Sequence, residues 1–265
     1  MKGNQAIGVF DSGVGGLTVL RALHARLPKE GTIYLGDTAR VPYGTKSPET
    51  ITRYALEIGR FLRSHDVKAI VVACSTASSV ALDALRAEHD VPILGVVEAG
   101  ANKALTVTRG GSVAVAATEA TVRSGAYARM MSRRRADVKV VQRACPLFVP
   151  LAEEGTVEGP LARAVVAHHL LDLKDSDVDT LLMGCTHYPL LRHAISEVLG
   201  ERITIVDGAD AVADELAALL SERGLLGTLE TPLRRYYASD DPRRMQVLGS
   251  RFLGSTVERV EGVEL

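Results

Sequence analysis

Residues 70–79 read IVVACSTASS, an apolar run that stops at Cys74 and continues at once with small hydroxyl residues. Residues 181–190, LLMGCTHYPL, repeat this arrangement around Cys185. Short, continuous apolar runs of this kind are typical of parallel strands that are buried on both faces. The sequence therefore predicts two similar units, each a strand that ends in a cysteine and a polar turn.

The same pattern extends along the whole chain of 265 residues, because short apolar runs alternate with segments of helical period. This alternation is typical of parallel strands joined by crossover helices, so the predicted fold class is α/β. The segment 233–254 predicts a further strand and helix that return to the first sheet. Strands are predicted at 6–10, 32–36, 69–74, 92–96, 112–117, 138–143, 180–185 and 203–207, and helices at 17–27, 47–65, 76–89 and 159–173.

The repeated cysteine turns predict two similar parallel-sheet α/β lobes, related by pseudo-two-fold symmetry, that face each other across a cleft. The first lobe is expected to comprise residues 1–97 plus 208–265 and to carry Cys74. The second is expected to comprise residues 98–207 and to carry Cys185. Ligands of open α/β sheets bind beyond the carboxyl ends of the strands, so we expect both cysteines at one site in the cleft.

Composition narrows the class of partner. Lys+Arg number 31 and Asp+Glu 32, and this near balance offers no broad charged surface for nucleic acid or an anionic membrane. No apolar run approaches the ~20 residues of a membrane span, and the start lacks the apolar core of a signal peptide. Three cysteines without a C-x-x-C pair fit reduced thiols. We therefore expect a cytoplasmic protein with a small-molecule partner.

The two cysteine turns suggest a particular chemistry. A thiol has a pKa of ~8.5, so holding it as a thiolate at pH 7 costs about 2 kcal/mol, and a helix N-terminus is expected to offset part of this. The hydroxyls of Ser75, Thr76 and Thr186 can hold a carboxylate nearby. Two opposed turns of this kind can remove a proton from one face of a carbon and return one to the other face. This favours racemisation or epimerisation.

Six stretches in order along the chain resemble glutamate racemase, of the aspartate/glutamate racemase family. A single stretch would be weak evidence, but six in register over nearly the entire chain are specific. They are GVFDSGVGGLTVL (8–20), YLGDTARVPYG (34–44), ACSTAS (73–78), ATEATVRSGAY (117–127), CPLFVPLAEEG (145–155) and GCTHYPLL (184–191).

The resemblance implies interconversion of L- and D-glutamate by proton transfer at Cα, supplying D-glutamate for peptidoglycan synthesis. It implies no pyridoxal phosphate, other cofactor or metal, and a homodimer. Cys74 and Cys185 would be the two bases, and Asp11 and His187 would assist proton movement at the two sulfurs. The substrate would be bound by Asp11, Ser12, Tyr43, Gly44, Ser75, Thr76, Thr118, Thr186 and His187, with Asp37 and Glu153 as acidic residues near the site.

One position departs from the family pattern. The family usually has Cys-Asn-Thr after the first strand of this kind, whereas Ser75 follows Cys74 here. Serine keeps a hydroxyl but lacks the two amide donors of asparagine. We therefore expect an altered KM or side-chain selectivity, with the chemistry retained.

Other interpretations of these residues stay open at this point. Cys185 and His187 could be two zinc ligands, although no other close Cys/His pair would complete a tetrahedral site. The glycines of DSGVGG could hold a phosphate, although neither nucleotide-binding glycine motif is present. Asp11 and Asp37 could cap helices and not contact substrate. Alternative functions are an aspartate or hydantoin racemase of the same superfamily, or a non-catalytic amino-acid-binding protein.

Overall fold

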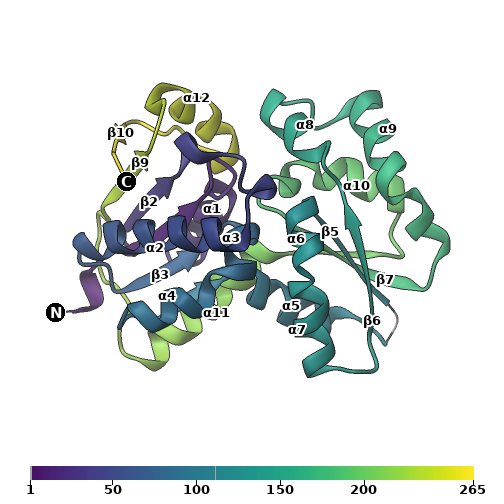
Figure 1. The fold of residues 1–265 in the computed structure, drawn as a ribbon, viewed down its shortest axis with the longest axis horizontal. Helices are drawn as coiled ribbons and strands as arrows, with labels where there is room; N and C mark the ends of the chain where they lie inside the picture. The colour runs from purple at the N-terminus through teal and green to yellow at the C-terminus, as the bar shows by residue number, and fades with distance from the viewer. Residues whose placement is uncertain (1, 111) are drawn as a thin grey trace.

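The computed structural model describes residues 2–110 and 112–265, which fold into two parallel β-sheets covered by helices (Figure 1). Every strand pairing among these residues is parallel, as the apolar, unalternating runs predicted. The first sheet has the order β10-β9-β2-β1-β3-β4 and the second β6-β5-β7-β8. Their strands are β1 Ile7–Asp11, β2 Thr32–Gly36, β3 Ala69–Val72, β4 Ile93–Gly95, β9 Arg234–Ala238 and β10 Val260–Gly262, then β5 Ser112–Ala117, β6 Lys139–Ala144, β7 Val178–Gly184 and β8 Thr204–Asp207.

The two sheets wind in the same way. Strands β1 to β4 have the spatial order β2-β1-β3-β4, and strands β5 to β8 have the equivalent order β6-β5-β7-β8. Cys74 follows β3 and Cys185 follows β7, so each cysteine lies after the third strand of its unit. The predicted α/β class with two similar lobes is confirmed. The C-terminal strand and helix do return to the first sheet, beside the N-terminal strands (Figure 1).

Helices follow most strands, and local sequence determines where several of them begin. The Ser47 side chain accepts a hydrogen bond from Thr50 N and caps a helix that starts with Pro48, as predicted. The helix predicted over 76–89 is instead divided at Ala81. The helices are α1 Leu17–Arg26, α2 Pro48–Ser64, α3 Ser75–Val80, α4 Leu82–Glu88, α5 Val96–Val107, α6 Glu119–Ser124, α7 Ala126–Arg134, α8 Phe148–Glu154, α9 Gly159–Leu170, α10 Arg192–Leu199, α11 Gly208–Glu222 and α12 Pro242–Leu253.

Two helices, α5 and α11, connect the lobes and pack against each other. The chain leaves the first sheet through α5, whose Val97 and Ala101 share a core cluster with Val115 and Leu182 of the second sheet. It returns through α11, whose apolar side chains pack against the core of the first lobe. The division into residues 1–97 plus 208–265 and 98–207 stays a prediction. No helix among the described residues is long and apolar enough to cross a membrane.

Candidate active site

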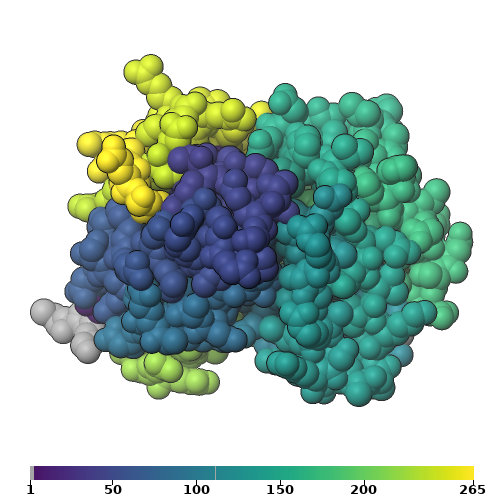
Figure 2. All heavy atoms as spheres, viewed as in Figure 1, coloured from purple at the N-terminus to yellow at the C-terminus, as the bar shows by residue number. Residues whose placement is uncertain are grey.

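A cavity of about 340 Å³ lies between the lobes, and both Cys74 and Cys185 line it. Figure 2 shows the seam along which the purple-to-blue surface of the first lobe meets the teal surface of the second. Much of the cavity wall consists of the turns that follow strands β1, β3, β5 and β7, as expected for the carboxyl ends of parallel strands. The first lobe contributes Asp11, Ser12, Gly13, Val14, Val41, Pro42, Tyr43, Gly44, Thr45, Cys74, Ser75 and Thr76, and the second Thr118, Glu119, Pro146, Val149, Pro150, Glu153, Cys185, Thr186 and His187.

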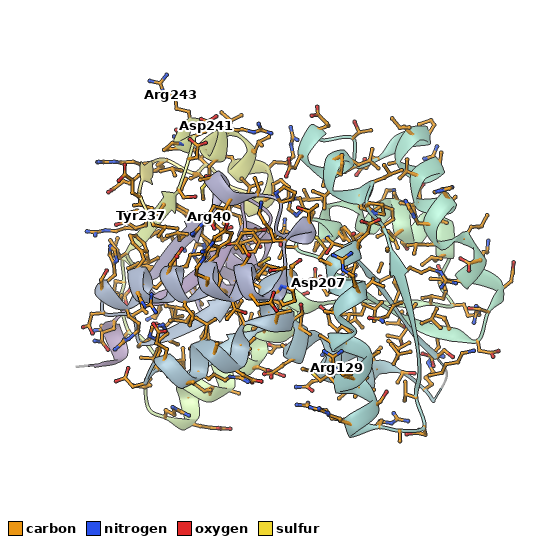
Figure 3. All side chains as sticks on the ribbon, viewed as in Figure 1. Arg40, Arg129, Asp207, Tyr237, Asp241 and Arg243 are labelled. Atoms are coloured by element: carbon orange, nitrogen blue, oxygen red, sulfur yellow. The ribbon has the colours of Figure 1, made fainter. Side chains whose placement is uncertain are left out.

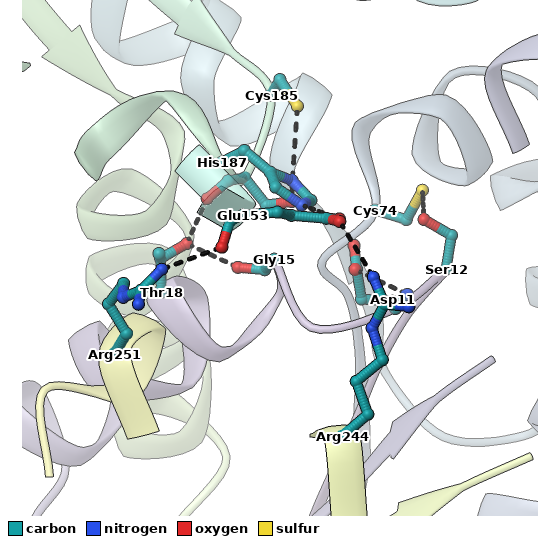
Figure 4. A network of polar contacts seen from close by, with 12 residues as sticks. Asp11, Ser12, Gly15, Thr18, Cys74, Glu153, Cys185, His187, Arg244 and Arg251 are labelled. Carbon is teal, nitrogen blue, oxygen red and sulfur yellow. Dashed lines mark hydrogen bonds and ion pairs between the residues drawn. The ribbon is translucent and has the colours of Figure 1, made fainter. Parts of the chain in front are cut away.

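Cys74 caps helix α3 and is almost completely buried. Its sulfur accepts a hydrogen bond from Ala77 N at 3.5 Å and donates one to Ser12 Oγ at 3.6 Å (Figure 4). Burial and the negative charge of Asp11 nevertheless raise the pKa of the Cys74 thiol to about 12. The expected stabilisation of the thiolate by the helix N-terminus is present but is outweighed, because the sulfur is shielded from water and lies close to the Asp11 carboxylate.

Asp11 ends strand β1 and is 1% exposed. One carboxylate oxygen, Oδ2, accepts a hydrogen bond from Gly13 N at 2.9 Å. The other, Oδ1, is buried with no hydrogen-bond partner among the described residues. Burial raises the pKa of this carboxyl group. A buried acceptor at the cavity wall without a partner is suited to binding a cationic group of a ligand.

Cys185 has a different set of neighbours. It is followed by a 3₁₀ helix, Tyr188–Leu191, and then by α10. His187 Nδ1 lies 3.9 Å from Cys185 Sγ, and His187 Nε2 lies 3.2 Å from Glu153 Oε1 (Figure 4). Burial lowers the pKa of His187, but the hydrogen bonds with Cys185 and Glu153 outweigh it and raise the pKa to about 10. An imidazolium therefore stands beside the second sulfur at neutral pH.

Two glycines of the turn after β1 allow this packing. A Cβ atom at Gly15 would lie less than 3.0 Å from the His187 ring and Thr186 Oγ1. A Cβ atom at Gly16 would lie equally close to Asp11 Cβ. Gly15 therefore permits close approach between the lobes, and Gly16 permits close packing of the turn against Asp11.

Hydroxyl groups from both lobes meet on the cavity wall. Thr76 Oγ1 lies 3.4 Å from Thr118 Oγ1 and 3.3 Å from Thr121 Oγ1. Thr118 also caps α6, because its side chain accepts a hydrogen bond from Thr121 N at 3.4 Å. The Ser75 side chain lies beside the buried Tyr127 hydroxyl. This cluster joins α3 of the first lobe to α6 and α7 of the second.

Asp37 lies behind the cavity wall and does not line the cavity. The Tyr43 hydroxyl donates a hydrogen bond to Asp37 Oδ2, to which Arg40 Nε also donates at 2.6 Å. Ser239 Oγ donates to the other oxygen at 2.8 Å. The fully buried Asp37 thus holds Tyr43 against the cavity. Of the site residues predicted from sequence, the other twelve line the cavity.

Sequence reasoning missed several residues of the site. Glu119, Val149 and Pro150 line the cavity, and Thr121 and Tyr127 lie beside lining residues. All five lie in the stretches 117–127 and 145–155, directly after predicted strands. Following the chain through the first helical turn beyond each strand would have found four of them, whereas nothing in the sequence marks Tyr127.

Comparison with known proteins agrees with this geometry. A family model described as Asp/Glu/hydantoin racemase matches residues 7–234. The chain belongs to this family. It is an amino-acid racemase, and the resemblance recognised in the sequence is confirmed. A glutamate racemase of Geobacter metallireducens is 52% identical over 262 residues, which cover 98% of this chain and 97% of the relative.

Solved structures of glutamate racemases have the same fold. The enzyme of Thermus thermophilus, in complex with β-chloro-D-alanine, is 46% identical with a TM-score of 0.90, and the match covers 99% of this chain and 98% of that enzyme. The enzyme of Francisella tularensis, in complex with D-glutamate, is 37% identical with a TM-score of 0.92 and the same coverage. The arrangement of the two lobes is thus shared with these relatives.

Proposed function

We propose that this racemase interconverts L- and D-glutamate by proton transfer between Cα and two cysteines, Cys74 and Cys185. The observation that carries the proposal is that these two thiols, one from each lobe, line a single cavity. The relatives named above, which match nearly the whole chain, are glutamate racemases. We further propose that the product serves peptidoglycan synthesis, which is the role that the family resemblance implies.

Glutamate would be held by groups that the cavity presents in pairs. The unpaired Asp11 oxygen accepts hydrogen bonds from the substrate ammonium. The hydroxyls of Thr76 and Thr118 donate to one carboxylate, and those of Ser75 and Thr186 to the other. Tyr43 and Gly44 close the wall beside Cys74, while Ser12 supports its sulfur. These contacts fix Cα between the two sulfurs, and orientation of this kind lowers the barrier to proton transfer.

One sulfur acts as base and the other as acid in each turnover. A Cys74 thiolate takes the Cα proton, and the electron pair of the broken C–H bond is delocalised into the adjacent carboxylate. The Cys185 thiol then gives its proton to the opposite face of Cα, which inverts the configuration. The reverse direction exchanges the two roles. The cationic substrate ammonium offsets part of the cost of a thiolate in this buried site, where the Cys74 pKa is otherwise raised.

Asp11 and His187 assist at the two sulfurs. The His187 imidazolium, held by Glu153, can supply a proton to Cys185 and stabilises negative charge there. Asp11 lies close enough to Cys74 for its charge to raise the thiol pKa, so an ammonium paired with Asp11 relieves this repulsion. The two cysteines are thus served by opposite charges, a carboxylate on one side and an imidazolium on the other.

Solvent exchange tests the proposal directly. L-glutamate incubated in D₂O with the enzyme should yield D-glutamate that carries deuterium at Cα. Cys74→Ser and Cys185→Ser should each reduce racemisation by about a thousandfold or more, because removal of an essential acid or base has effects of this order. Full racemisation by either variant, or turnover of aspartate or a hydantoin with no turnover of glutamate, would contradict it.

A further inference from the structure

The His187–Glu153 pair of the second lobe is covered by a helix of the first lobe, α12. Arg251 Nη1 donates a hydrogen bond to the Glu153 carbonyl oxygen at 2.8 Å, and Arg244 Nη2 lies 3.9 Å from Glu153 Oε2 (Figure 4). The buried Phe252 ring stands edge-on to the His187 ring, with 5.1 Å between their centroids. Three side chains of one helix thus contact the groups behind Cys185.

These contacts divide the polar groups of Glu153 between the lobes. Oε1 pairs with His187 of its own lobe, whereas Oε2 faces Arg244 and the backbone carbonyl binds Arg251. Glu153 is the second-last residue of helix α8, which ends just before Gly155. A guanidinium at the C-terminal end of a helix interacts favourably with the unpaired carbonyl groups there. A Cβ atom at Gly155 would lie less than 3.0 Å from the Arg251 guanidinium, so the two elements approach closely.

The hydrogen bonds of the Cys74 sulfur lie within its own lobe, namely with Ala77 N and Ser12 Oγ. Ser12 and Asp11, the two groups beside its sulfur, belong to the same lobe as Cys74. Asp11 in turn is held by Gly13 N of its own turn. The opposite lobe therefore bonds to different groups in the two halves of the site: to the Thr76 hydroxyl beside Cys74, and to Glu153 of the His187–Glu153 pair beside Cys185.

We propose that helix α12 positions the His187–Glu153 pair for proton transfer at Cys185, with Arg244 and Arg251 as positioning residues. The inference rests on the proposed two-cysteine mechanism. Its consequence is that the proton-transfer groups of Cys185 are assembled only while the lobes are together. Figure 2 shows the yellow-green C-terminal segment in contact with the teal lobe at the end of the seam.

The electrostatics of Glu153 agree with this arrangement. The hydrogen bond from His187 lowers the pKa of Glu153, burial opposes it, and the charges of His187 and Arg244 lower it further. Removal of Arg244 should therefore raise the pKa of Glu153, so that the acidic limb of the rate profile moves to higher pH. The Arg244 side chain is 67% exposed, so solvent screens its charge and the displacement should be small.

Kinetic isotope effects on kcat/KM can separate the two proton transfers. When Cys185 removes a deuterium from Cα, slowing this step makes it more rate-limiting and increases the isotope effect. When Cys74 removes the deuterium, slowing the later step at Cys185 decreases the isotope effect. Arg244→Met and Arg251→Met should therefore move the isotope effects of [2-²H]-L-glutamate and [2-²H]-D-glutamate in opposite directions. We expect kcat/KM to fall about two- to fivefold for Arg244→Met and about three- to tenfold for Arg251→Met.

Matched variants control this experiment. Arg243→Met removes the same charge from the neighbouring residue, whose side chain points away from the molecule (Figure 3), and should leave both isotope effects unchanged. Ser12→Ala removes the hydroxyl beside Cys74 and should move the two isotope effects in the reverse sense. Arg244→Lys and Arg251→Lys should recover most of the activity, which separates positioning from loss of folding. Thermal unfolding of each variant provides a second check.

The outcomes of these experiments distinguish the role of α12 from the two-cysteine mechanism. Isotope effects that move in the same direction for both enantiomers, or Arg244→Met and Arg251→Met variants that behave like Arg243→Met, would overturn the role of α12 and leave the two-cysteine mechanism intact. Full activity of Cys74→Ser or Cys185→Ser, or no racemisation of glutamate by the natural enzyme, would overturn both proposals.

Discussion

Ser75 stands where the family motif usually has asparagine, and its surroundings specify what the difference should do. It lines the cavity next to Cys74, and its side chain lies beside the Tyr127 hydroxyl. Ser75→Asn adds two amide donors without touching a proton-transfer group. We expect KM for glutamate to fall about three- to tenfold, because a hydrogen bond to a charged group contributes about 1.5–3 kcal/mol and part of this is offset by crowding. Steady-state kinetics should show kcat nearly unchanged. A loss of kcat by a factor as large as the change in KM would mean that Ser75 takes part in proton transfer.

His187 also links the site to stability at the scale of a single residue. Its pKa is raised to about 10 in the folded protein, above the ~6.5 of an unfolded chain. Its contribution to the free energy of unfolding is therefore fully present below pH ~6.5 and is lost as pH rises towards 10. Urea unfolding at pH 6.5 and 9.5 should show the difference in stability between the natural protein and His187→Gln shrinking with pH. A difference that stays constant would mean that the imidazole is neutral when folded.

The turn between β1 and α1 allows a prediction at the scale of secondary-structure elements. A methyl group at Gly15 would meet the His187 ring and Thr186, so Gly15→Ala should displace the turn of the second lobe that carries Cys185 and His187. We expect kcat to fall by about tenfold or more, with a smaller change in KM, because small misplacement of a catalytic group has a large effect on rate. Gly262→Ala, at an exposed position with only ordinary contacts, is the control. A normal kcat in Gly15→Ala would contradict this prediction and show that the turn accommodates the methyl group without displacing the catalytic residues.

Elements also show how far sequence patterns reach. Most of the predicted strands are recognisable because they are continuous apolar runs, and two of them, Thr32–Gly36 and Ser112–Ala117, match the predicted limits. The helix over 76–89 was misjudged at Ala81, since periodicity does not reveal a local break. The site residues gathered because parallel strands end at one edge. The contact of α12 with α8 could not be predicted from the sequence, because it depends on tertiary packing. Arg244 and Arg251 resemble any exposed helical arginines.

At the scale of the whole molecule, the site exists only where two lobes meet, so their mutual hydrogen bonds should matter for both stability and rate. Arg123 Nη2 donates to Gly44 O at 3.5 Å on one side of the cavity, and Thr18 Oγ1 donates to Thr186 O at 2.9 Å on the other. Thr18 is 2% exposed and lies in α1 of the first lobe. The carbonyl that it binds is next to His187.

Thr18→Val keeps the shape of the side chain and removes this bond together with the hydroxyl contact to Gly15 O, which keeps its bond from Thr18 N. The Thr186 carbonyl is then left without its hydroxyl donor, at a cost of about 1–3 kcal/mol. We expect the melting temperature to fall by about 2–4 °C for each kcal/mol and kcat/KM to fall with it, because the turn that carries Cys185 and His187 loses its anchor on the first lobe. Thr18→Ser keeps the hydroxyl and should retain most of the rate. If Thr18→Val lowers the melting temperature but leaves kcat/KM unchanged, the bond serves folding alone, and the lobes must hold the two sulfurs in register through α5 and α11.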